Sequence, residues 1–322
     1  MSKMGGMGEN GPSLSSQPAS SCSGQDLYTW RIWALQQANA ADVAPNEVDW
    51  FLQGVTELDN LALRLRTYQG RPAIATRFPL DILTVKWQQR IQDRVPVQYL
   101  VGETPWRDFM LTVTPAVLIP RPETELIIDI GRALVNNSSR RIELEQGIWV
   151  DMGTGSGAIS LGLAKALPDA RIIATDVSAA ALAIAQQNAN RQQLADRIEF
   201  RQGAWFDPLT DLKGQLAGVV SNPPYIPSQM VLTLSAEVTH HEPHNALDGG
   251  QDGLDDIRQL AKAAPAYLCP GGLWLIEMMA GQADTVQSIL QRQVLQCQKV
   301  YGGIQPHPDL AGLQRFVSAY RR

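Results

Sequence analysis

The chain has 322 residues, 44% of them hydrophobic, and a formal net charge of −5, which is typical of a soluble globular protein with a large and a smaller domain. This negative charge argues against a protein that holds long DNA or RNA mainly through phosphate contacts. Cys22, Cys269 and Cys297 lack C-x-x-C spacing, and the chain has neither a long apolar run nor an apolar signal core. We therefore expect free thiols, no membrane span and a cytoplasmic location.

The N-terminal third is predicted to be a tail followed by a helical domain. Residues 1–24 are rich in Ser and Gly and poor in large apolar residues, which predicts disorder. Over 25–95 apolar residues recur at helical spacing, which predicts a small helical domain. Its helices are expected at 27–35, 48–55, 58–65 and 80–91.

The second half of this helical domain is locally basic. A solvated helix face explains the charges better than a docking surface for an acidic or RNA-bearing partner. The residues concerned are Arg64, Arg66, Arg71, Arg77, Lys86, Arg90 and Arg94.

Residues 96–120 are predicted to link two domains, with a β-hairpin where 107–119 alternate and are rich in Val, Thr and Leu. Over 121–322, β-rich runs alternate with helical runs such as 178–193. This alternation predicts an α/β domain with a mostly parallel sheet that is covered on both faces. Strands are expected at 148–151, 171–176, 198–201, 218–221, 273–277, 296–301 and 315–320.

A glycine-rich loop follows the first of these strands and opens a helix. Glycines at 153, 155 and 157 allow tight turns and close approach of a ligand to the backbone, and the helix start offers free N–H donors. Asp176 ends the next strand and could accept from ribose hydroxyls, or it could cap the helix that begins near Ser178. The loop predicts nucleoside binding, but it fits a nicotinamide dehydrogenase as well.

The tetrapeptide Asn222-Pro223-Pro224-Tyr225 decides between these readings. The side-chain oxygen of Asn222 and the carbonyl of Pro223 can each accept one N–H of an NH₂ group, which orients its lone pair for in-line attack. Pro-Pro is stiff, and Tyr225 offers a flat face to a planar acceptor. Asn-Pro also makes ordinary turns, but a dehydrogenase gives no reason for this sequence after a strand.

These motifs, in this order, resemble those of the release factor glutamine methyltransferases. That family methylates the side-chain amide nitrogen of the glutamine in the Gly-Gly-Gln motif of class I peptide release factors. The likeness runs from about residue 96 to the C-terminus. It includes residues 96–102, 118–125, 151–157, 222–226, 242–243, 246–250, 252–254 and 270–272.

The resemblance implies a Rossmann-like class I methyltransferase fold with a seven-stranded sheet and S-adenosyl-L-methionine as the cofactor. It also implies a release factor as the protein partner, gripped with help from the helical domain. Catalytic roles fall on Asn222, Pro223 and Tyr225. For the cofactor, the resemblance implies Gly153, Thr154, Gly155, Ser156 and Gly157 at the methionine part, Asp176 at the ribose, Trp205 at the adenine, and Asn222. For the acceptor glutamine it implies Asn222, Pro223, Pro224 and Tyr225, with Arg121 and Glu123 shaping the site.

Some of these residues also have simpler readings, and other functions stay open. An aromatic residue such as Trp205 is more often part of a core, and Arg121 with Glu123 could be an ordinary surface pair. Alternatives are a glutamine methyltransferase of a ribosomal protein, a DNA adenine methyltransferase, or a non-catalytic protein that binds a translation factor. No tetrahedral metal site is evident among His240, His241, Glu242 and His244, so no metal is expected.

Overall fold

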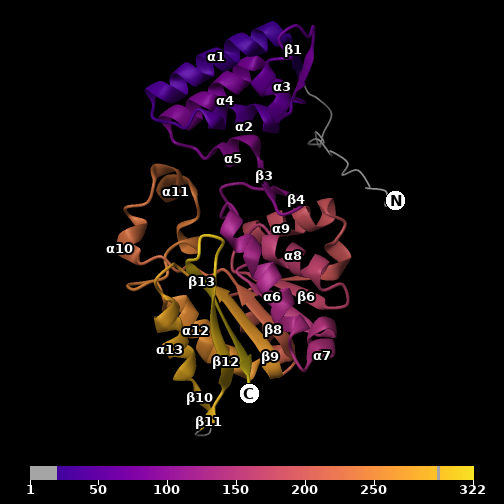
Figure 1. The fold of residues 1–322 in the computed structure, drawn as a ribbon, viewed down its shortest axis with the longest axis vertical. Helices are drawn as coiled ribbons and strands as arrows, with labels where there is room; N and C mark the ends of the chain where they lie inside the picture. Colours follow the sequence, from indigo (N-terminus) through magenta and orange to yellow (C-terminus); the bar gives the residue numbers. More distant parts are fainter. Residues whose placement is uncertain (1–19, 296–297) are drawn as a thin grey trace, which may run out of the picture. The chain divides into compact units, whose positions relative to one another are not determined.

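The computed structural model describes residues 20–295 and 298–322. The chain folds into two compact units that divide after Glu103, and we describe each unit by itself (Figure 1). The first unit thus reaches past the boundary that the sequence predicted at residue 95. Cys22 and Cys269 are free thiols, whereas Cys297 lies outside the described residues. Within the described ranges, no helix is long and apolar enough to cross a membrane.

The first unit is a small helical bundle with its own apolar core, which includes Trp30, Phe51 and Trp87. All four predicted helices are present, and α5 and a two-stranded sheet are additional. The prediction of disorder is wrong for residues 20–24, because β1 pairs with β2 and α1 begins at Gly24. The elements are β1 (Ser20–Cys22), α1 (Gly24–Ala40), α2 (Asn46–Val55), α3 (Asn60–Leu65), β2 (Ile74–Thr76), α4 (Leu80–Gln92) and α5 (Val97–Val101).

The basic residues of this unit are largely engaged inside it. Arg90 is buried and forms an ion pair with Glu47 at 2.6 Å, and Arg77 pairs with Glu103 at 3.0 Å. Lys86 Nζ donates to a backbone carbonyl of α5 at 3.1 Å. The interpretation as one solvated basic face is therefore wrong for these three side chains, because each holds one part of the helical unit to another.

The predicted β-hairpin is present but is shorter and lies earlier than expected at 107–119. It consists of β3 (Glu103–Trp106) and β4 (Phe109–Thr112), with Arg107 at φ 52° in the turn. Pro115 cannot donate to a strand ladder, and the chain turns there instead, with Val117 N donating to Thr114 O at 3.0 Å. The segment after the hairpin is thereby free to line the cavity described below.

The second unit is built on the predicted seven-stranded sheet, and the order of its strands is β12-β13-β9-β8-β5-β6-β7. Strands β5 to β9 are mutually parallel, whereas β13 is antiparallel to β9 and β12. The strand predicted at 296–301 is not one strand of the sheet: residues 296–297 lie outside the described ranges, Gln298–Lys299 belong to a separate hairpin, and the strand of the sheet begins at Tyr301. The strands are β5 (Ile148–Met152), β6 (Arg171–Asp176), β7 (Ile198–Gln202), β8 (Leu216–Ser221), β9 (Leu268–Glu277), β12 (Tyr301–Pro308) and β13 (Gln314–Arg321). A separate hairpin pairs β10 (Val294–Leu295) with β11 (Gln298–Lys299).

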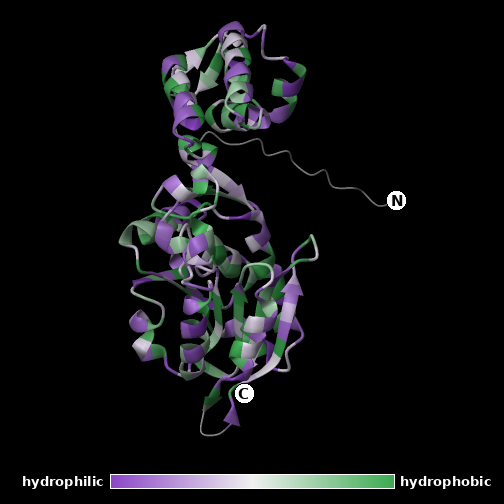
Figure 2. Cartoon of the chain, turned by 90° about the vertical axis from the view of Figure 1, so that its left-hand side faces the viewer, coloured by the Kyte–Doolittle hydropathy of each residue, from purple (hydrophilic) through white to green (hydrophobic). Residues whose placement is uncertain are grey.

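The two faces of the sheet carry separate apolar cores. Successive side chains of a strand point to opposite faces, so Trp149 belongs to one core and its neighbour Val150 to the other. One core includes side chains of α6 (Leu126–Asn136), α7 (Arg141–Gln146), α8 (Ala158–Ala166) and α9 (Ala179–Arg191), and the other those of η3 (Asp207–Leu212), α12 (Asp255–Ala263) and α13 (Ala283–Gln291). Apolar residues accordingly concentrate in the central strands (Figure 2). The remaining short helices are η1 (Pro122–Glu125), η2 (Ala195–Arg197), α10 (Ser228–Val231), α11 (Ala236–His241), η4 (His244–Ala246) and η5 (Ala264–Ala266).

The strand order reverses beside β5. From β5 the chain proceeds outward through β6 and β7, and it then returns to the other side of β5 with β8 and β9. Connections leave the carboxyl ends of β5 and β8 in opposite directions, which opens a crevice at that edge. A ligand site is therefore expected beyond the carboxyl ends of these two strands.

Candidate functional site

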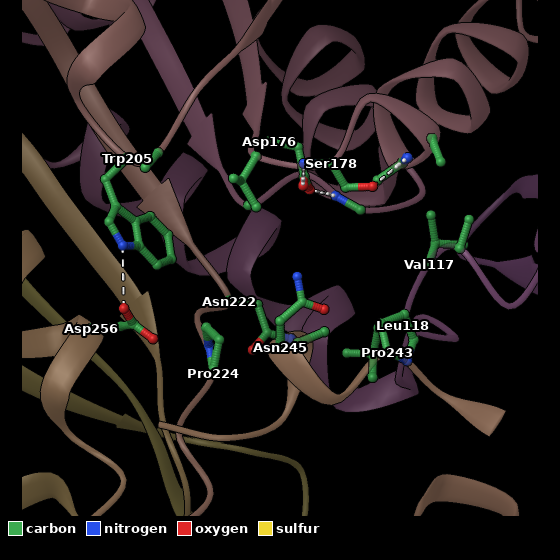
Figure 3. A pocket seen from close by; sticks show the side chains of 18 of the residues that line it. Val117, Leu118, Asp176, Ser178, Trp205, Asn222, Pro224, Pro243, Asn245 and Asp256 are labelled. Atoms are coloured by element: carbon green, nitrogen blue, oxygen red, sulfur yellow. Dashed lines mark hydrogen bonds between the residues drawn. The ribbon is translucent and has the colours of Figure 1, made fainter. Parts of the chain in front are cut away.

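A cavity of about 480 Å³ opens at this edge of the sheet, within the second unit (Figure 3). Its volume lies in the range of about 300–1,000 Å³ that is usual for small-molecule sites. Residues that follow four neighbouring strands form much of its wall: Gly153 after β5, Asp176 at the end of β6, Trp205 after β7 and Asn222 after β8. The parallel sheet thus brings together residues that are far apart in the sequence.

The glycine loop contributes Gly153 and Gly155 to the cavity wall. Both have positive φ, 71° and 54°, a region that glycine adopts without the steric cost of a Cβ. Thr154, Ser156 and Gly157 were predicted to contact the cofactor, but they are not among the residues that line the cavity. The hydroxyl of Thr154 instead donates to buried Asp151 at 2.6 Å.

Asp151 fixes the beginning of this loop. Its carboxylate is fully buried, and one oxygen accepts from Thr154 and from both the backbone N and the hydroxyl of Ser160. Burial raises the pKa of Asp151 to about 6, although these hydrogen bonds favour its charged form. The loop is thereby attached to the first turn of α8 rather than held only by its own backbone.

Asp176 joins the loop to the next strand while it faces the cavity. Its two oxygens accept from Gly155 N and Ser178 N, each at 2.9 Å. A carboxylate has about four acceptor positions, so capacity remains for two further donors. Burial raises the pKa of Asp176, which the backbone hydrogen bonds oppose. The helix cap of α9 is Ser178, whose hydroxyl accepts from Ala181 N, so capping does not account for Asp176.

The indole of Trp205 is half-buried, packs against one of the two apolar cores and forms another wall of the cavity. Its Nε1 donates to Asp256 Oδ1 at 3.2 Å, and Asp256 lines the cavity as well (Figure 3). The backbone of Trp205 has φ 45°, which costs roughly 1–3 kcal/mol for a bulky residue. Such strain persists only where the surroundings impose it, so the position of this flat ring is enforced.

The predicted tetrapeptide begins at this cavity. Asn222 and Pro224 line it, whereas Pro223 is buried and Tyr225 is only half-buried, and neither forms part of its wall. Asn222 Nδ2 donates to Thr124 Oγ1 at 3.2 Å, and Tyr225 OH donates to Glu277 Oε1 at 3.1 Å. The tetrapeptide therefore lies beside the cavity that Asp176 and Trp205 define, with both polar side chains held by buried partners.

Arg121 does not form an ion pair with Glu123. Its guanidinium donates to both oxygens of Glu242, at 2.8 and 2.9 Å, and Glu242 is almost fully buried. Glu123 is exposed, and its negative charge interacts electrostatically with Arg315. Neither Arg121 nor Glu123 lines the cavity, but the pair Arg121–Glu242 holds the chain next to Pro243, which does. Among the described residues, no group of His, Cys, Asp and Glu side chains could hold a metal ion.

Several cavity residues were not predicted from the sequence. Val177 follows Asp176, lines the cavity and is 58% exposed although it is apolar, and this exposure is visible only in the structure. Gln282 does not line the cavity, but it is buried and donates to Tyr225 O at 3.0 Å, so it fixes the backbone of the tetrapeptide. Other wall residues that the sequence did not single out are Pro115, Ala116, Val117, Asn245 and Asp256, whereas Leu118 and Ala246 stand in segments that carry the family resemblance.

A model of an enzyme family matches part of the second unit. Residues 125–251 match the family model described as the methyltransferase small domain. Together with the Rossmann-like sheet and the cavity at its reversal point, this match points to a methyltransferase, and the relatives below show that the protein is one.

Curated relatives identify the family. The release factor glutamine methyltransferase of Synechocystis sp. is 48% identical over 297 residues, which are 92% of this chain and 97% of the relative. That of Thermosynechococcus vestitus is 44% identical and covers 92% of this chain and 99% of the relative. The chain belongs to the release factor glutamine methyltransferase family.

A solved structure supports the fold. The hMettl16 catalytic domain, in complex with a MAT2A 3′UTR hairpin, matches with a TM-score of 0.52 and 13% identity, over 83% of this chain and 88% of that chain. At this identity the likeness concerns the fold alone.

Proposed function

We propose that this enzyme transfers a methyl group from S-adenosyl-L-methionine to the side-chain amide nitrogen, N5, of the glutamine in the Gly-Gly-Gln motif of class I release factors. The family supports this proposal, and one observation carries it. Asn222, which offers a hydrogen-bond acceptor to an NH₂ group, lines the same cavity as the nucleoside-binding candidates Asp176 and Trp205. A release factor as substrate also implies that the protein works in the cytoplasm.

The residues of the cavity fit the cofactor. Asp176 has acceptor capacity for two ribose hydroxyls, and the fixed indole of Trp205 offers a flat surface to an adenine. Gly153 and Gly155 leave room for the methionine part, whereas Thr154, Ser156 and Gly157 set the shape of the loop. When bound, the cofactor supplies an electrophilic methyl carbon on a sulfonium.

Asn222 and Pro223 are proposed to orient the acceptor amide. Because Asn222 Nδ2 is engaged by Thr124, its Oδ1 is left to accept one N–H of the substrate, and the carbonyl of Pro223 accepts the other. An amide nitrogen is a weak nucleophile, since its lone pair is delocalised. Fixing its orientation can lower the barrier by several kcal/mol, with an upper range of about 7–11 kcal/mol.

The remaining predicted residues are proposed to shape the acceptor site around Asn222 and Pro223. Tyr225, which Glu277 holds outside the cavity wall, is proposed to present its ring to the planar amide, and Pro224 lines the cavity. Arg121 is proposed to shape the acceptor side through Glu242 rather than by contact with the substrate. Glu123 is exposed next to this region, where a protein substrate can reach it.

Methyl transfer to purified acceptors tests the proposal. The protein is incubated with S-adenosyl-L-methionine and a class I release factor, and the product is digested and mapped by mass spectrometry. A single methyl group on the Gly-Gly-Gln glutamine is expected, and none on a matched release factor with glutamate in its place.

The same assay separates the alternatives. A large-subunit ribosomal protein and double-stranded DNA are offered in parallel reactions. Methyl transfer to either one in preference to the release factor would contradict the proposal. Tight cofactor binding without any product, measured by calorimetry, would indicate a protein that binds but does not turn over.

A further inference from the structure

Asp256 binds the indole of Trp205 and also lines the cavity. It stands in the first turn of α12 and is half-buried. Its Oδ1 accepts from Trp205 Nε1 at 3.2 Å, and its other oxygen, Oδ2, turns away from the ring (Figure 3). Within the described ranges, Oδ2 has no hydrogen-bond partner. Asp256 therefore brings an acceptor with unused capacity to the wall of the cavity.

The indole extends along the cavity wall from the glycine loop to α12. A Cβ added at Gly153 would lie 3.6 Å from Cζ3 of Trp205, an atom of the six-membered ring. Nε1 belongs to the five-membered ring at the other end of the indole, and there it meets Asp256. Asp176 is bonded to the glycine loop, because it accepts from Gly155 N at 2.9 Å. The carboxylates of Asp176 and Asp256 thus lie on different sides of one flat ring (Figure 3).

This arrangement gives a bound adenosine a direction. When the ribose lies at Asp176, an adenine against the indole has its far edge turned away from Asp176 and toward α12. That edge carries the exocyclic amino group, which can only donate hydrogen bonds once its lone pair is delocalised into the ring. A carboxylate can only accept, so Oδ2 of Asp256 complements an amino group and repels a carbonyl oxygen.

We infer that Asp256 is a specificity-determining residue, which selects a 6-amino purine through Oδ2 while its Oδ1 fixes the indole that the purine lies against. This inference deepens the proposed function. It rests on the assignment of Asp176 to the ribose and of Trp205 to the adenine. The two oxygens have separate tasks, so a substitution that replaces only one of them can distinguish the tasks.

The surroundings of Asp256 favour an added donor. Burial raises the pKa of Asp256, the hydrogen bond from Trp205 lowers it, and the negative charges of Asp255 and Asp248 raise it. A partly desolvated carboxylate near two others gains more from an NH₂ donor than a fully solvated one does. Asp255 and Asp248 do not line the cavity, so Asp256 is the one of these three carboxylates that a ligand there can meet.

Two ligands that differ in the purine test the inference in wild-type protein. S-Inosylhomocysteine has a carbonyl oxygen where S-adenosylhomocysteine has the amino group. We expect it to bind about 10- to 100-fold more weakly in calorimetry, which is the effect of losing a hydrogen bond to a charged group. Equal dissociation constants for the two ligands would overturn the inference.

Asp256→Asn assigns the preference to this residue. Trp205 Nε1 needs an acceptor, so the amide oxygen takes the place of Oδ1 and the amide NH₂ group takes the place of Oδ2. This NH₂ group meets the amino group of adenine unfavourably, but it can donate to the carbonyl of hypoxanthine. We expect the preference for S-adenosylhomocysteine to shrink at least about tenfold. The midpoint of urea unfolding should stay near that of wild type, because Trp205 keeps its partner. An unchanged preference would overturn the inference, even if both ligands bound more weakly.

Asp255→Asn is the matched control, because it removes the same charge one residue away. Asp255 is exposed, forms an ion pair with Arg258 at 3.1 Å and does not line the cavity. Its preference between the two ligands should stay within about twofold of wild type, since exposed charges act weakly through solvent. An equal change in Asp255→Asn and Asp256→Asn would mean that net charge, and not the position of Oδ2, sets the preference, which would overturn the inference.

These binding measurements need no release factor, so they separate the inference from the proposed function. If the preference is present in wild type and lost in Asp256→Asn, but wild type methylates no release factor, the proposed acceptor fails and the role of Asp256 stands. If wild type methylates the release factor but Asp256→Asn keeps the wild-type preference, the role of Asp256 fails and the proposed function stands.

Discussion

At the scale of single residues, the nitrogen and the oxygen of the Asn222 side-chain amide have different tasks. Nδ2 is held by Thr124, and Oδ1 is left for a substrate. We predict that Asn222→Ala lowers kcat/KM for a release factor by about 10²–10³, the usual effect of removing one group that acts on the transition state. The dissociation constant of the cofactor, measured by calorimetry, should change less than threefold.

Asn245→Ala is the matched control for Asn222→Ala, because Asn245 is an asparagine in the wall of the same cavity. It should leave kcat/KM within a few-fold of wild type. An equal loss in both variants would mean that the cavity responds to any truncation, and Asn222 would have no special role.

Asp176 is expected to behave in the opposite way. Because it both holds the glycine loop and has two acceptor positions left, Asp176→Ala should weaken cofactor binding about 10- to 100-fold, as lost hydrogen bonds to a charged group do. Binding of S-adenosylhomocysteine measured by calorimetry checks this. Asp169→Ala, at an exposed aspartate, should not alter affinity. An unchanged dissociation constant in Asp176→Ala would leave that residue with a purely structural task.

The sequence predicted site residues at the ends of strands, but it did not predict the residues that hold the site in place through hydrogen bonds. Asp176 and Asn222 each stand one polar residue after an apolar run, so their position at a sheet edge follows from local pattern. Thr124, Asp256 and Gln282 act on partners that are distant along the chain, and no spacing rule connects them. For the same reason the partner of Arg121 was sought at Glu123 and found at Glu242.

At the scale of elements, one ion pair fixes the segment that follows α11. Glu242 lies between α11 and η4, and its bond to Arg121 holds Pro243 and Ala246 at the cavity. We predict that Glu242→Ala speeds amide hydrogen exchange over residues 236–246 and raises KM for the release factor several-fold, while the central strands keep their protection.

Glu145→Ala is the control for this change, because Glu145 belongs to an exposed pair with Arg141 at 2.7 Å within α7. Exposed pairs of this kind contribute little to stability. If hydrogen exchange near α11 were the same in Glu242→Ala and Glu145→Ala, the buried pair would not be what anchors that segment.

Helices and strands with a clear pattern of apolar residues were predicted well, whereas elements whose position depends on a turn or on a distant partner were not. Strands β5, β6 and β8 and the second half of β9 are buried on both faces and appear as apolar runs between helices, whereas the edge strand β7 is only partly buried. The hairpin was placed too late because Val, Thr and Leu continue past Thr112, whereas the turn depends on Arg107 with positive φ. β1 is only three residues long and pairs with β2, so its own sequence carries almost no signal.

At the scale of the whole molecule, the cavity lies entirely in the second unit, whereas the helical unit has a separate core. Saturation with S-adenosylhomocysteine at about 100 times its dissociation constant should stabilise the unit that binds it by about 2.7 kcal/mol. We predict slower hydrogen exchange after β5, β6 and β8, and no change in the cores of α1, α2 and α4. Mass spectrometry of exchanged peptides measures both, and equal protection of the two units would contradict a site confined to one.

The change in the spacing of apolar residues along the chain predicted a helical unit and an α/β unit, but it did not predict the residue at which the two units divide. The first unit extends to Glu103 because α5 packs Val97, Leu100 and Val101 into the helical core, and this short helix has no periodic pattern. The net charge of the whole chain was informative, but the local excess of basic residues in the helical unit was not, because ion pairs such as Arg90–Glu47 neutralise much of it.

The hydrogen bonds of Asp176 also bear on how the site meets its ligand. The carboxylate that is proposed to receive the ribose is already tied to the glycine loop and to the segment before α9 through two backbone amides. Most of the loss of freedom in that loop therefore happens when the protein folds, not when the small molecule arrives. Binding of the nucleoside should consequently be fast and should leave the loop backbone almost unchanged, because the loop is already ordered before the ligand arrives.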